Sequence, residues 1–334
     1  MQKKLNLLKY KSIIIDIRRF TMKKRILATI LVGAVAATTV MGLAACGGAS
    51  IPKGEQVTEE AWKNAFDKTT EFTNYTLNSS SDLDINLKGT VTAKGSKKVE
   101  VKSTVSTSSN QLFLYDKDGH TSYAEYTTES KGKSTADDEE SNYSRKTTNK
   151  QYYTLCESNS LIDTYWRASY SKSETKTEEG ENYTENYWYA NESLSFSSNQ
   201  AAYVFNDYFY DSNDKDTAKR AKLANLYDKF KYSGGVYKAT LYYYQEVSED
   251  YNLSDLLECK VTVSIKDGCA VGYGIKINVK NANLYLKDYY DIKYSYKLDA
   301  KCGITDVKST DVSKKATKDI TKVIDKAKAD KEKD

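Results

Sequence analysis

Apolar and polar residues alternate with a period of two along much of this chain. Such alternation is typical of strands with one buried face and one solvent face. Asp116–Gly119 is a hairpin signal between two of these stretches. The pattern predicts a meander of five short strands within about fifty residues. These strands are expected around 75–77, 83–91, 99–105, 112–115 and 122–126.

Three segments carry a helical pattern instead. Thr58 is placed to cap a helix over Glu59–Thr70, whose face would carry Trp62, Phe66 and Thr69. A second helix is expected from Asp216 or Thr217 to Phe230, because Leu223, Leu226, Tyr227 and Phe230 have i, i+3, i+4, i+7 spacing. A last helix is expected over Asp311–Lys328, with Ile320, Val323, Ile324 and Ala327 as its apolar stripe. Gln200–Tyr210 is ambiguous between helix and strand, and we favour a helix there.

Cys259–Val279 has the clearest strand pattern. A two-residue turn at Asp267-Gly268 would pair Ile265 with Ala270, which points to the other face. A three-residue loop over 266–268 pairs Ile265 with Cys269 and keeps the apolar residues together. We therefore expect the three-residue loop, with Cys259 opposite Ile275.

Two stretches lack an apolar pattern. Thr127–Asn149 contains Asp137-Asp138-Glu139-Glu140, and Lys172–Glu185 is also acidic. Both are expected to be solvated loops. The intervening residues 151–156 and 164–170, and also 187–196 and 236–247, are expected strands.

The segment Met22–Cys46 combines Lys23-Lys24-Arg25, an uncharged run over 26–43, and Leu43-Ala44-Ala45-Cys46. A basic start, an apolar middle and small residues before the cleavage point are the pattern of a secretory signal. The 18-residue run leaves a retained transmembrane helix as the alternative. Residues 1–21 precede a better start at Met22, so we expect them to be a mis-called N-terminal extension.

Composition changes when residues 1–45 are set aside. They hold nine Lys/Arg and one Asp, so the 50 basic and 46 acidic residues fall to 41 and 45, a net charge of −4. A basic protein that binds nucleic acid is therefore not indicated. The remaining 289 residues suffice for one large β-rich domain.

Candidate chemistry is sparse. The single histidine, His120, follows a hairpin turn and is expected to be solvated. Asp211–Asp216 partly matches a calcium loop, but Lys215 and Asp216 stand where a ligand and a glycine belong, so a turn is favoured. Cys156, Cys259, Cys269 and Cys302 are either free thiols, which we favour, or disulfide partners. The 29 tyrosines either contact sugars or an apolar ligand, or simply furnish a large sheet.

The motifs together resemble a group of lipoproteins from Gram-positive bacteria. The resemblance rests on the lipobox ending at Cys46, on 57–62 (VTEEAW), 72–76 (FTNYT), 227–230 (YDKF) and 265–268 (IKDG). That group is similar to the half-barrel fold of lipoprotein-localisation factors and mycobacterial lipid carriers. The resemblance implies a diacylglycerol on Cys46 and an antiparallel sheet curled around one or two helices.

We therefore expect an α+β protein, mainly antiparallel β, with a curled antiparallel sheet (a half-barrel) packed with a few helices. Residues 22–45 would be the signal peptide, 46–56 a lipidated tether, 57–310 a single domain and 311–334 a C-terminal helix and charged tail. It would be anchored on the outer face of the cytoplasmic membrane as a non-enzymatic binding module, without cofactor, metal or nucleic acid. The ligand would be a lipid or other apolar molecule; the alternative is a wall polysaccharide or protein bound through exposed Tyr and Trp, including Trp166 and Trp188. Residues expected to contact an apolar ligand are Trp62, Phe66, Tyr237, Leu241, Tyr243, Tyr273 and Ile275.

Overall fold

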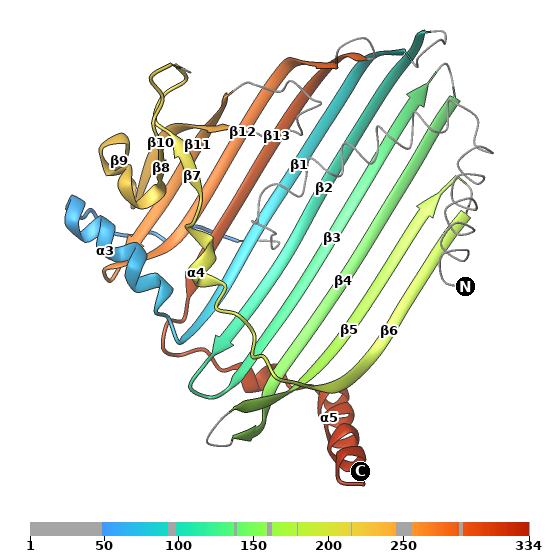
Figure 1. Cartoon of the computed structure of the whole chain (residues 1–334), viewed down its shortest axis with the longest axis vertical. Coiled ribbons are helices and arrows are strands. Elements are labelled where there is room, and N and C mark those ends of the chain that lie inside the picture. The colour runs from blue at the N-terminus through green and yellow to red at the C-terminus, as the bar shows by residue number, and fades with distance from the viewer. Residues whose placement is uncertain are drawn as a thin grey trace, which may run out of the picture.

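Thirteen strands of the described chain form one antiparallel sheet (Figure 1). The structure is a computed structural model that describes residues 49–92, 98–136, 139–158, 162–178, 180–214, 216–244, 256–286 and 290–333. The strand order is β6-β5-β4-β3-β2-β1-β13-β12-β11-β10-β7-β8, with β9 paired to β10. The sheet is open, with β6 at one edge and β8 at the other.

Six long strands form one half of the sheet, each paired with the next along the chain. They are β1 (Asn74–Thr92), β2 (Lys98–Asp116), β3 (Thr121–Ala136), β4 (Glu139–Ser158), β5 (Asp163–Thr177) and β6 (Gly180–Ser193). The other half is β7 (Tyr208–Tyr210), β8 (Arg220–Lys222), β9 (Lys231–Ser233), β10 (Val236–Tyr244), β11 (Leu256–Lys266), β12 (Cys269–Leu286) and β13 (Tyr290–Thr305). The pairing of β13 with β1 joins the two halves.

Helices are few in the described residues. They are the α-helices α3 (Glu59–Thr70), α4 (Ala201–Val204) and α5 (Lys318–Lys331), with 3-10 turns η2 (Leu223–Asn225), η3 (Tyr227–Lys229) and η4 (Val312–Lys315). The expected α+β class, a half-barrel packed with helices, is therefore wrong: the protein is mostly antiparallel β, in one large open sheet. Several strands lie where the sequence pattern predicts loops or helices.

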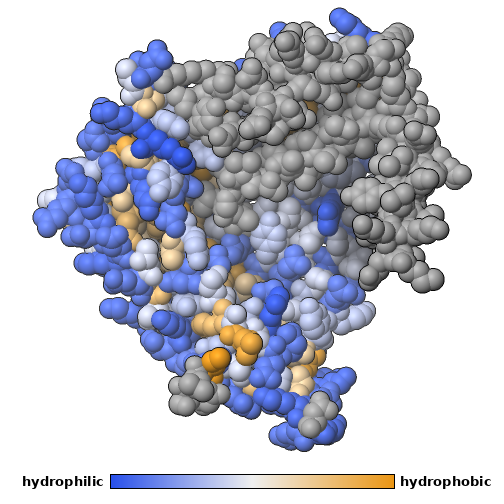
Figure 2. All heavy atoms as spheres, in the orientation of Figure 1, coloured by the Kyte–Doolittle hydropathy of each residue, from blue (hydrophilic) through white to orange (hydrophobic). Residues whose placement is uncertain are grey.

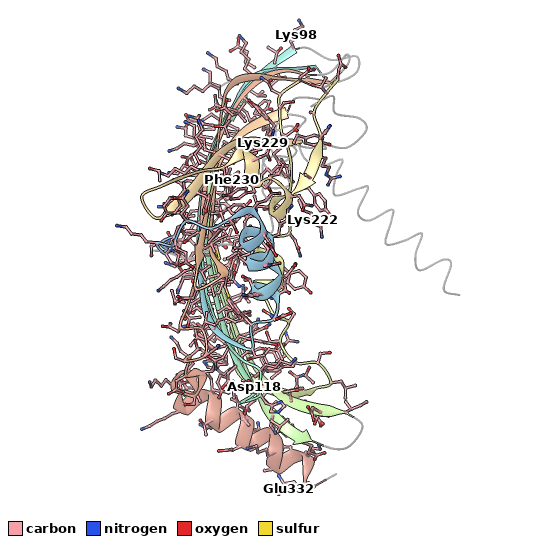
Figure 3. The ribbon with its side chains drawn as sticks, turned by 90° about the vertical axis from the view of Figure 1, so that its left-hand side faces the viewer. Lys98, Asp118, Lys222, Lys229, Phe230 and Glu332 are labelled. Carbon is pink, nitrogen blue, oxygen red and sulfur yellow. The ribbon has the colours of Figure 1, made fainter. Side chains whose placement is uncertain are left out.

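The sheet is curved, and its two faces carry different elements (Figures 1 and 3). We call the side that carries α3 the concave face; Leu77 and Phe113 point to it. We call the side that carries α5 the convex face; Leu114 points to it. Since side chains alternate along a strand, each strand contributes every second residue to each face.

α3 covers the concave face of the β10–β13 half. Thr58 caps it by accepting a hydrogen bond from the backbone N–H of Ala61, and Trp62, Phe66 and Thr69 are buried as expected. The Trp62 ring lies 5.1 Å from Phe66 and 5.0 Å from Tyr237, and its indole N–H donates to the Ala224 carbonyl at 3.1 Å. This half of the concave face is therefore a closed aromatic core.

α5 covers the convex face near β5 and β6 instead. Ile320 and Ile324 of α5 pack with Trp166 and Ala168 of β5, which are all buried. Thr317 caps α5 by accepting from the backbone N–H of Ile320. The expected helix over Asp311–Lys328 is thus partly wrong, because Val312–Lys315 forms a separate 3-10 turn and α5 begins at Lys318.

Residues 50–57, which we call the strap, cross the convex face and pass to the concave one. Ile51 and Pro52 lie against Gly272, Gly274 and Gly303, where any Cβ would come within 2.4–2.7 Å of the strap. The Glu55 N–H then donates to the Ile265 carbonyl at 2.8 Å, and the Val57 N–H donates to the Tyr237 hydroxyl at 2.6 Å. The segment expected to be a tether is therefore packed on the sheet from Ser50 onward. Both core clusters use only residues from Val57 onward.

The two stretches expected to be loops are strands. Residues 127–136 and 139–149 extend β3 and β4, and 172–177 and 180–185 extend β5 and β6. The five expected short strands likewise merge into β1, β2 and β3. In these extensions charged residues alternate with uncharged polar residues, so an apolar period could not reveal them.

Two more local expectations hold only in part. Residues 216–230 form β8, η2 and η3 rather than one helix, although Leu223, Leu226 and Phe230 are buried against α3 as their spacing suggested. Gln200–Tyr210 contains only the four-residue α4, followed by β7.

The β11–β12 hairpin uses the two-residue turn that the sequence argued against. Ile265 pairs with Ala270, Val263 pairs with Tyr273, and Cys259 faces Ile277 rather than Ile275. Asp267 and Gly268 both have positive φ, at 53° and 71°, as such turns need. A bulge between Ser264 and Ile265 returns the apolar residues to one face.

Candidate functional site: the concave face of β3 to β6

The concave face of β3–β6 is built from uncharged polar side chains. Its central feature is the hydroxyl row, in which six Ser or Thr residues lie directly opposite one another on six adjacent strands. The row consists of Ser81, Ser109, Thr128, Thr147, Ser173 and Thr184. With strands about 4.8 Å apart, it presents one hydroxyl per strand over about 24 Å.

The next row toward α3 is also polar. Gln111, Tyr126, Asn149, Ser171 and Asn186 lie opposite one another on β2–β6. The Asn186 amide donates to the Ser171 hydroxyl at 2.8 Å. Amide and hydroxyl groups both donate and accept hydrogen bonds, so this surface can match a ligand rich in hydroxyls.

Charge is almost absent from this face. Six rows of β3–β6, from Ser122–Tyr153–Arg167–Asn191 to Gly132–Tyr143–Thr177–Gly180, contain no Lys, Asp or Glu at their concave positions. Arg145 and Arg167 carry the charge there. On the convex face, the same strands carry the ion pairs Lys150–Glu125, Lys146–Glu129 and Lys172–Glu174. The segregation of charge makes the two faces chemically distinct.

Several polar atoms on this face lack a protein partner. Within the described structure, the Ser122, Thr128 and Ser169 hydroxyls and Arg167 Nε are buried without a hydrogen-bond partner. Leaving such groups unpaired costs about 1–3 kcal/mol each. Burial also raises the pKa of Tyr143, whose hydroxyl has no partner either, so its phenol remains protonated. These groups therefore keep a hydrogen-bonding capacity that no described residue uses.

The face remains open to solvent at many of these positions. Thr147, Asn149, Gln151 and Ser173 are half-buried, and Asn186 is exposed. Figure 2 shows pale side chains of intermediate hydropathy in the middle of this face, between the strongly hydrophilic elements around it. Tyr189, at the β6 edge, is 53% exposed and adds an aromatic ring to the row that contains Gln151 and Ser169.

Six of the seven residues expected to contact a ligand are instead packed against one another. Trp62, Phe66, Tyr237, Leu241, Tyr273 and Ile275 are buried in the core beneath α3, and Tyr243 is half-buried beside it. The structure thus brings all seven together. The Tyr273 hydroxyl donates to Asp207 at 2.8 Å, and burial raises the pKa of that carboxyl. Cys46 lies outside the described residues.

The two tryptophans near the expected loops are on the convex side. Trp166 is buried beneath α5, and Trp188 is half-buried next to Tyr170 at 5.7 Å between ring centroids. Neither contributes to the polar concave face. The residues that do so were missed because their signal is a two-residue alternation of charged with uncharged polar residues.

Two clefts lie elsewhere. One of about 600 Å³ lies between the strap, the end of α3 and the rim of the sheet, and contains both Lys266 and Asp267. The other, of about 530 Å³, lies where β12 bulges and is lined mainly by polar residues of β1, β12 and β13. Neither includes any of the seven expected ligand residues.

Other candidate chemistry remains local. His120 Nδ1 lies 3.5 Å from the Tyr165 hydroxyl, in a turn with φ of 49°. Asp214 accepts hydrogen bonds from the Asp216 N–H and the Thr217 hydroxyl, and so closes a turn. Cys156, Cys259, Cys269 and Cys302 are not joined in disulfides. Among the described side chains, no three His, Cys, Asp or Glu residues gather as a metal site would require.

The fold and this face define an open antiparallel sheet with a polar, nearly uncharged concave surface. No protein-family model matches the chain, and no curated protein sequence matches it. Two solved structures give weak similarity. The translocator domain of the autotransporter NalP from Neisseria meningitidis is 8% identical, with 73% of this chain and 93% of that chain covered and a TM-score of 0.14. The transport unit of the autotransporter AIDA-I from Escherichia coli is 7% identical, with 75% and 100% covered and a TM-score of 0.19. Scores this low carry no argument. Within the described residues, no helix has the length and apolar content to span a bilayer.

Proposed function

We propose that this protein is a lipid-anchored, extracytoplasmic, non-enzymatic module that binds a wall glycan on its concave face. The observation that carries the proposal is the hydroxyl row, flanked by amides and tyrosines and free of Lys, Asp and Glu on β3–β6. A neutral polyhydroxylated chain matches such a surface, because each sugar hydroxyl finds donors and acceptors without charge desolvation.

Aromatic and arginine side chains add to this recognition. Tyr126 and Tyr189 present rings beside the polar rows, and aromatic faces stack on the apolar faces of sugars. Arg145 stands in the row next to the hydroxyl row and Arg167 in the row nearest α3, where their guanidinium groups suit a carboxylate on an acidic sugar. The lipobox pattern ending at Cys46 supports the anchor and an extracytoplasmic location.

Calorimetric titration of the chain beginning at Gly47 with soluble peptidoglycan fragments and wall polysaccharides tests the proposal. Tryptophan fluorescence is a poor reporter, because Trp166 and Trp188 lie on the convex side. Thr147→Val together with Ser173→Ala should weaken binding about tenfold or more, since two hydrogen bonds are lost.

Thr148→Val is the matched control. Thr148 is the neighbour of Thr147 on β4 and is also half-buried, but it faces Thr127 and Lys172 on the convex side. It should bind glycan like the parent. An equal loss of glycan binding in the double variant and in Thr148→Val, or no binding to any of the glycans, would show that the concave face is not the glycan site.

A second candidate is an apolar ligand at the far end of the same face. Val99, Val101 and Ala136 are buried there although neither core cluster includes them, and Val101 lies opposite Ala136. An acyl chain suits such a strip. Native mass spectrometry after incubation with lipid extract should show retained lipid, and Val101→Thr should reduce the amount retained. A spectrum without lipid would reject the apolar ligand and leave the glycan as the proposed ligand.

A further inference from the structure

Three lysines lie directly opposite one another on the convex face. Lys293 of β13 pairs with Lys88 of β1, and Lys88 pairs with Lys102 of β2. All three are exposed, and no ion pair joins any of them to a described residue. Like charges directly opposite on neighbouring strands destabilise a sheet. This lysine triad is therefore a position where an anion would relieve repulsion.

The cleft of about 530 Å³ adjoins the lysine triad. Asn86 and Ser295, one row along from Lys88 and Lys293, lie opposite each other and line it. Lys280 and Lys297 line it as well, with Asp84 as the acidic member. Lys297 Nζ lies 4.0 Å from Asp84 Oδ2, so the triad and cleft together offer four ammonium groups outside that ion pair, and these suit a phosphodiester headgroup.

The strap is on the same face. Ile51 and Pro52 pack on the convex side of Gly272, Gly274 and Gly303, so the strap begins on that side. Lys293 is ten positions before Gly303 on β13, so the lysine triad lies about 33 Å along the strand from the strap. Long nitrogen-tipped side chains project from this side in Figure 3.

We propose that the convex face docks on an anionic membrane surface, with phospholipid headgroups bound by the lysine triad and its cleft. This orientation on the membrane depends on the lipid anchor at Cys46 that the proposed function includes. A bilayer is favoured over a soluble polyanion because the strap begins on this face and the proposed anchor at Cys46 is only three residues before the first described residue, Ala49. The polar concave face then points away from the membrane, toward the wall.

The test uses the chain beginning at Gly47, which lacks the anchor, so that any binding belongs to the protein surface. It should sediment with vesicles containing phosphatidylglycerol and not with vesicles of phosphatidylcholine alone, and added salt should weaken the binding. Lys88→Gln, Lys102→Gln and Lys293→Gln combined should reduce affinity on the order of a hundredfold, from about 1 kcal/mol per lysine.

The control removes the same number of charges from the concave side. Lys63→Gln, Lys68→Gln and Lys229→Gln, on α3 and η3, should change vesicle affinity less than about twofold. The triad variant should also melt no lower than the parent, because its repulsion is gone, and this shows that it folds.

Absence of binding to phosphatidylglycerol vesicles, or equal loss in the two triple variants, would overturn the proposal. So would triad-dependent binding to soluble polyglycerol phosphate without vesicle binding, which would point to a wall polymer. The glycan titrations are separate: a triad variant that binds glycan normally but not vesicles would support both proposals, and failure of glycan binding would leave the vesicle result intact.

Discussion

The two halves of the concave face differ in their helical cover and in the side chains that fill them. Over β10–β13, α3 and the 3-10 turns cover the sheet, and Trp62 touches Phe66, Tyr227, Phe230 and Tyr237 in a closed aromatic core. Over β3–β6, the described residues place no helix on the concave side, and hydroxyl and amide groups fill the rows. Helical cover there is on the convex side, from α5.

This difference separates stability from recognition. The covered half gains free energy by burying apolar area, at about 25 cal/mol per Å². The open half gains it from long strand pairing, from the ion pairs of its convex face and from the contacts of α5. Its concave side chains contribute little packing, so they are free to serve a ligand.

Trp62→Ala should have the largest effect. Trp62 is fully buried and its indole N–H is hydrogen-bonded to the Ala224 carbonyl. We expect the free energy of unfolding to fall by about 3–5 kcal/mol in urea titrations. Trp188→Ala, at a half-buried position next to Tyr170, should cost clearly less. Equal costs would mean that stability is not concentrated under α3.

Gly272→Ala with Gly303→Ala should come next, because the new methyl groups meet the strap. A Cβ at Gly303 would lie 2.4 Å from the Ser50 carbonyl oxygen, and one at Gly272 would lie 2.6 Å from Ile51. We expect a loss of about 1–3 kcal/mol and faster proteolysis within residues 50–56. Ser80→Val, on the same face at a half-buried position, is the control and should leave the strap protected.

Asp207→Asn should have a smaller effect, and one that depends on pH. Burial raises the pKa of Asp207, against the opposing hydrogen bond from Tyr273. The native state therefore binds this proton more tightly than the unfolded state. Its contribution to stability is full below the unfolded pKa of about 3.9 and is lost as the pH rises through the native pKa.

Asp207→Asn avoids this loss of stability at high pH, because the amide side chain does not titrate. Its melting temperature should exceed that of the parent at pH 7, and the difference should vanish in acid below the unfolded pKa. A constant difference across that range would show that the carboxyl does not titrate as its burial implies.

Thr147→Val should have the smallest effect on stability. Thr147 is a half-buried member of the hydroxyl row, and Val suits a strand at least as well. We expect the free energy of unfolding to change by less than about 0.5 kcal/mol in denaturant titrations. A loss of several times this size would show that the hydroxyl row holds the sheet together rather than serving a ligand.

Part of the fold could be predicted from the sequence. Helix α3, with its Thr58 cap and its buried Trp62, follows from the spacing of apolar residues and from the capping residue. The sequence pattern predicts each of the long strands β1 and β2 as two short strands, because Ser79 to Ser81 and Ser106 to Asn110 interrupt the apolar alternation. Hydrogen bonding to neighbouring strands carries them through these polar residues.

The candidate site could not be predicted by the same reasoning. In β3–β6 the useful alternation is between charged and neutral polar residues, such as Lys146-Thr147 and Lys172-Ser173. Apolar periodicity treats both classes alike, and high polarity indicates a loop. Likewise, the bulge at Ser264/Ile265 depends on pairing with β12, which no local pattern of β11 contains.

One edge of the sheet has a consequence for how molecules of this protein meet. β6 is fourteen residues long, and its outer backbone groups face away from β5. Such an edge is a template for self-association. Yet β6 contains Glu181, Glu185 and Glu192 and no Lys or Arg, and hydrogen bonds from Tyr183 and Tyr170 lower the pKa of Glu185. Two copies meeting edge to edge would bring together six carboxylates, of which those of Glu181 and Glu192 are partly offset by their ion pairs with Lys176 and Lys331. We expect the repulsion between these carboxylates to oppose edge-to-edge growth of the sheet at neutral pH.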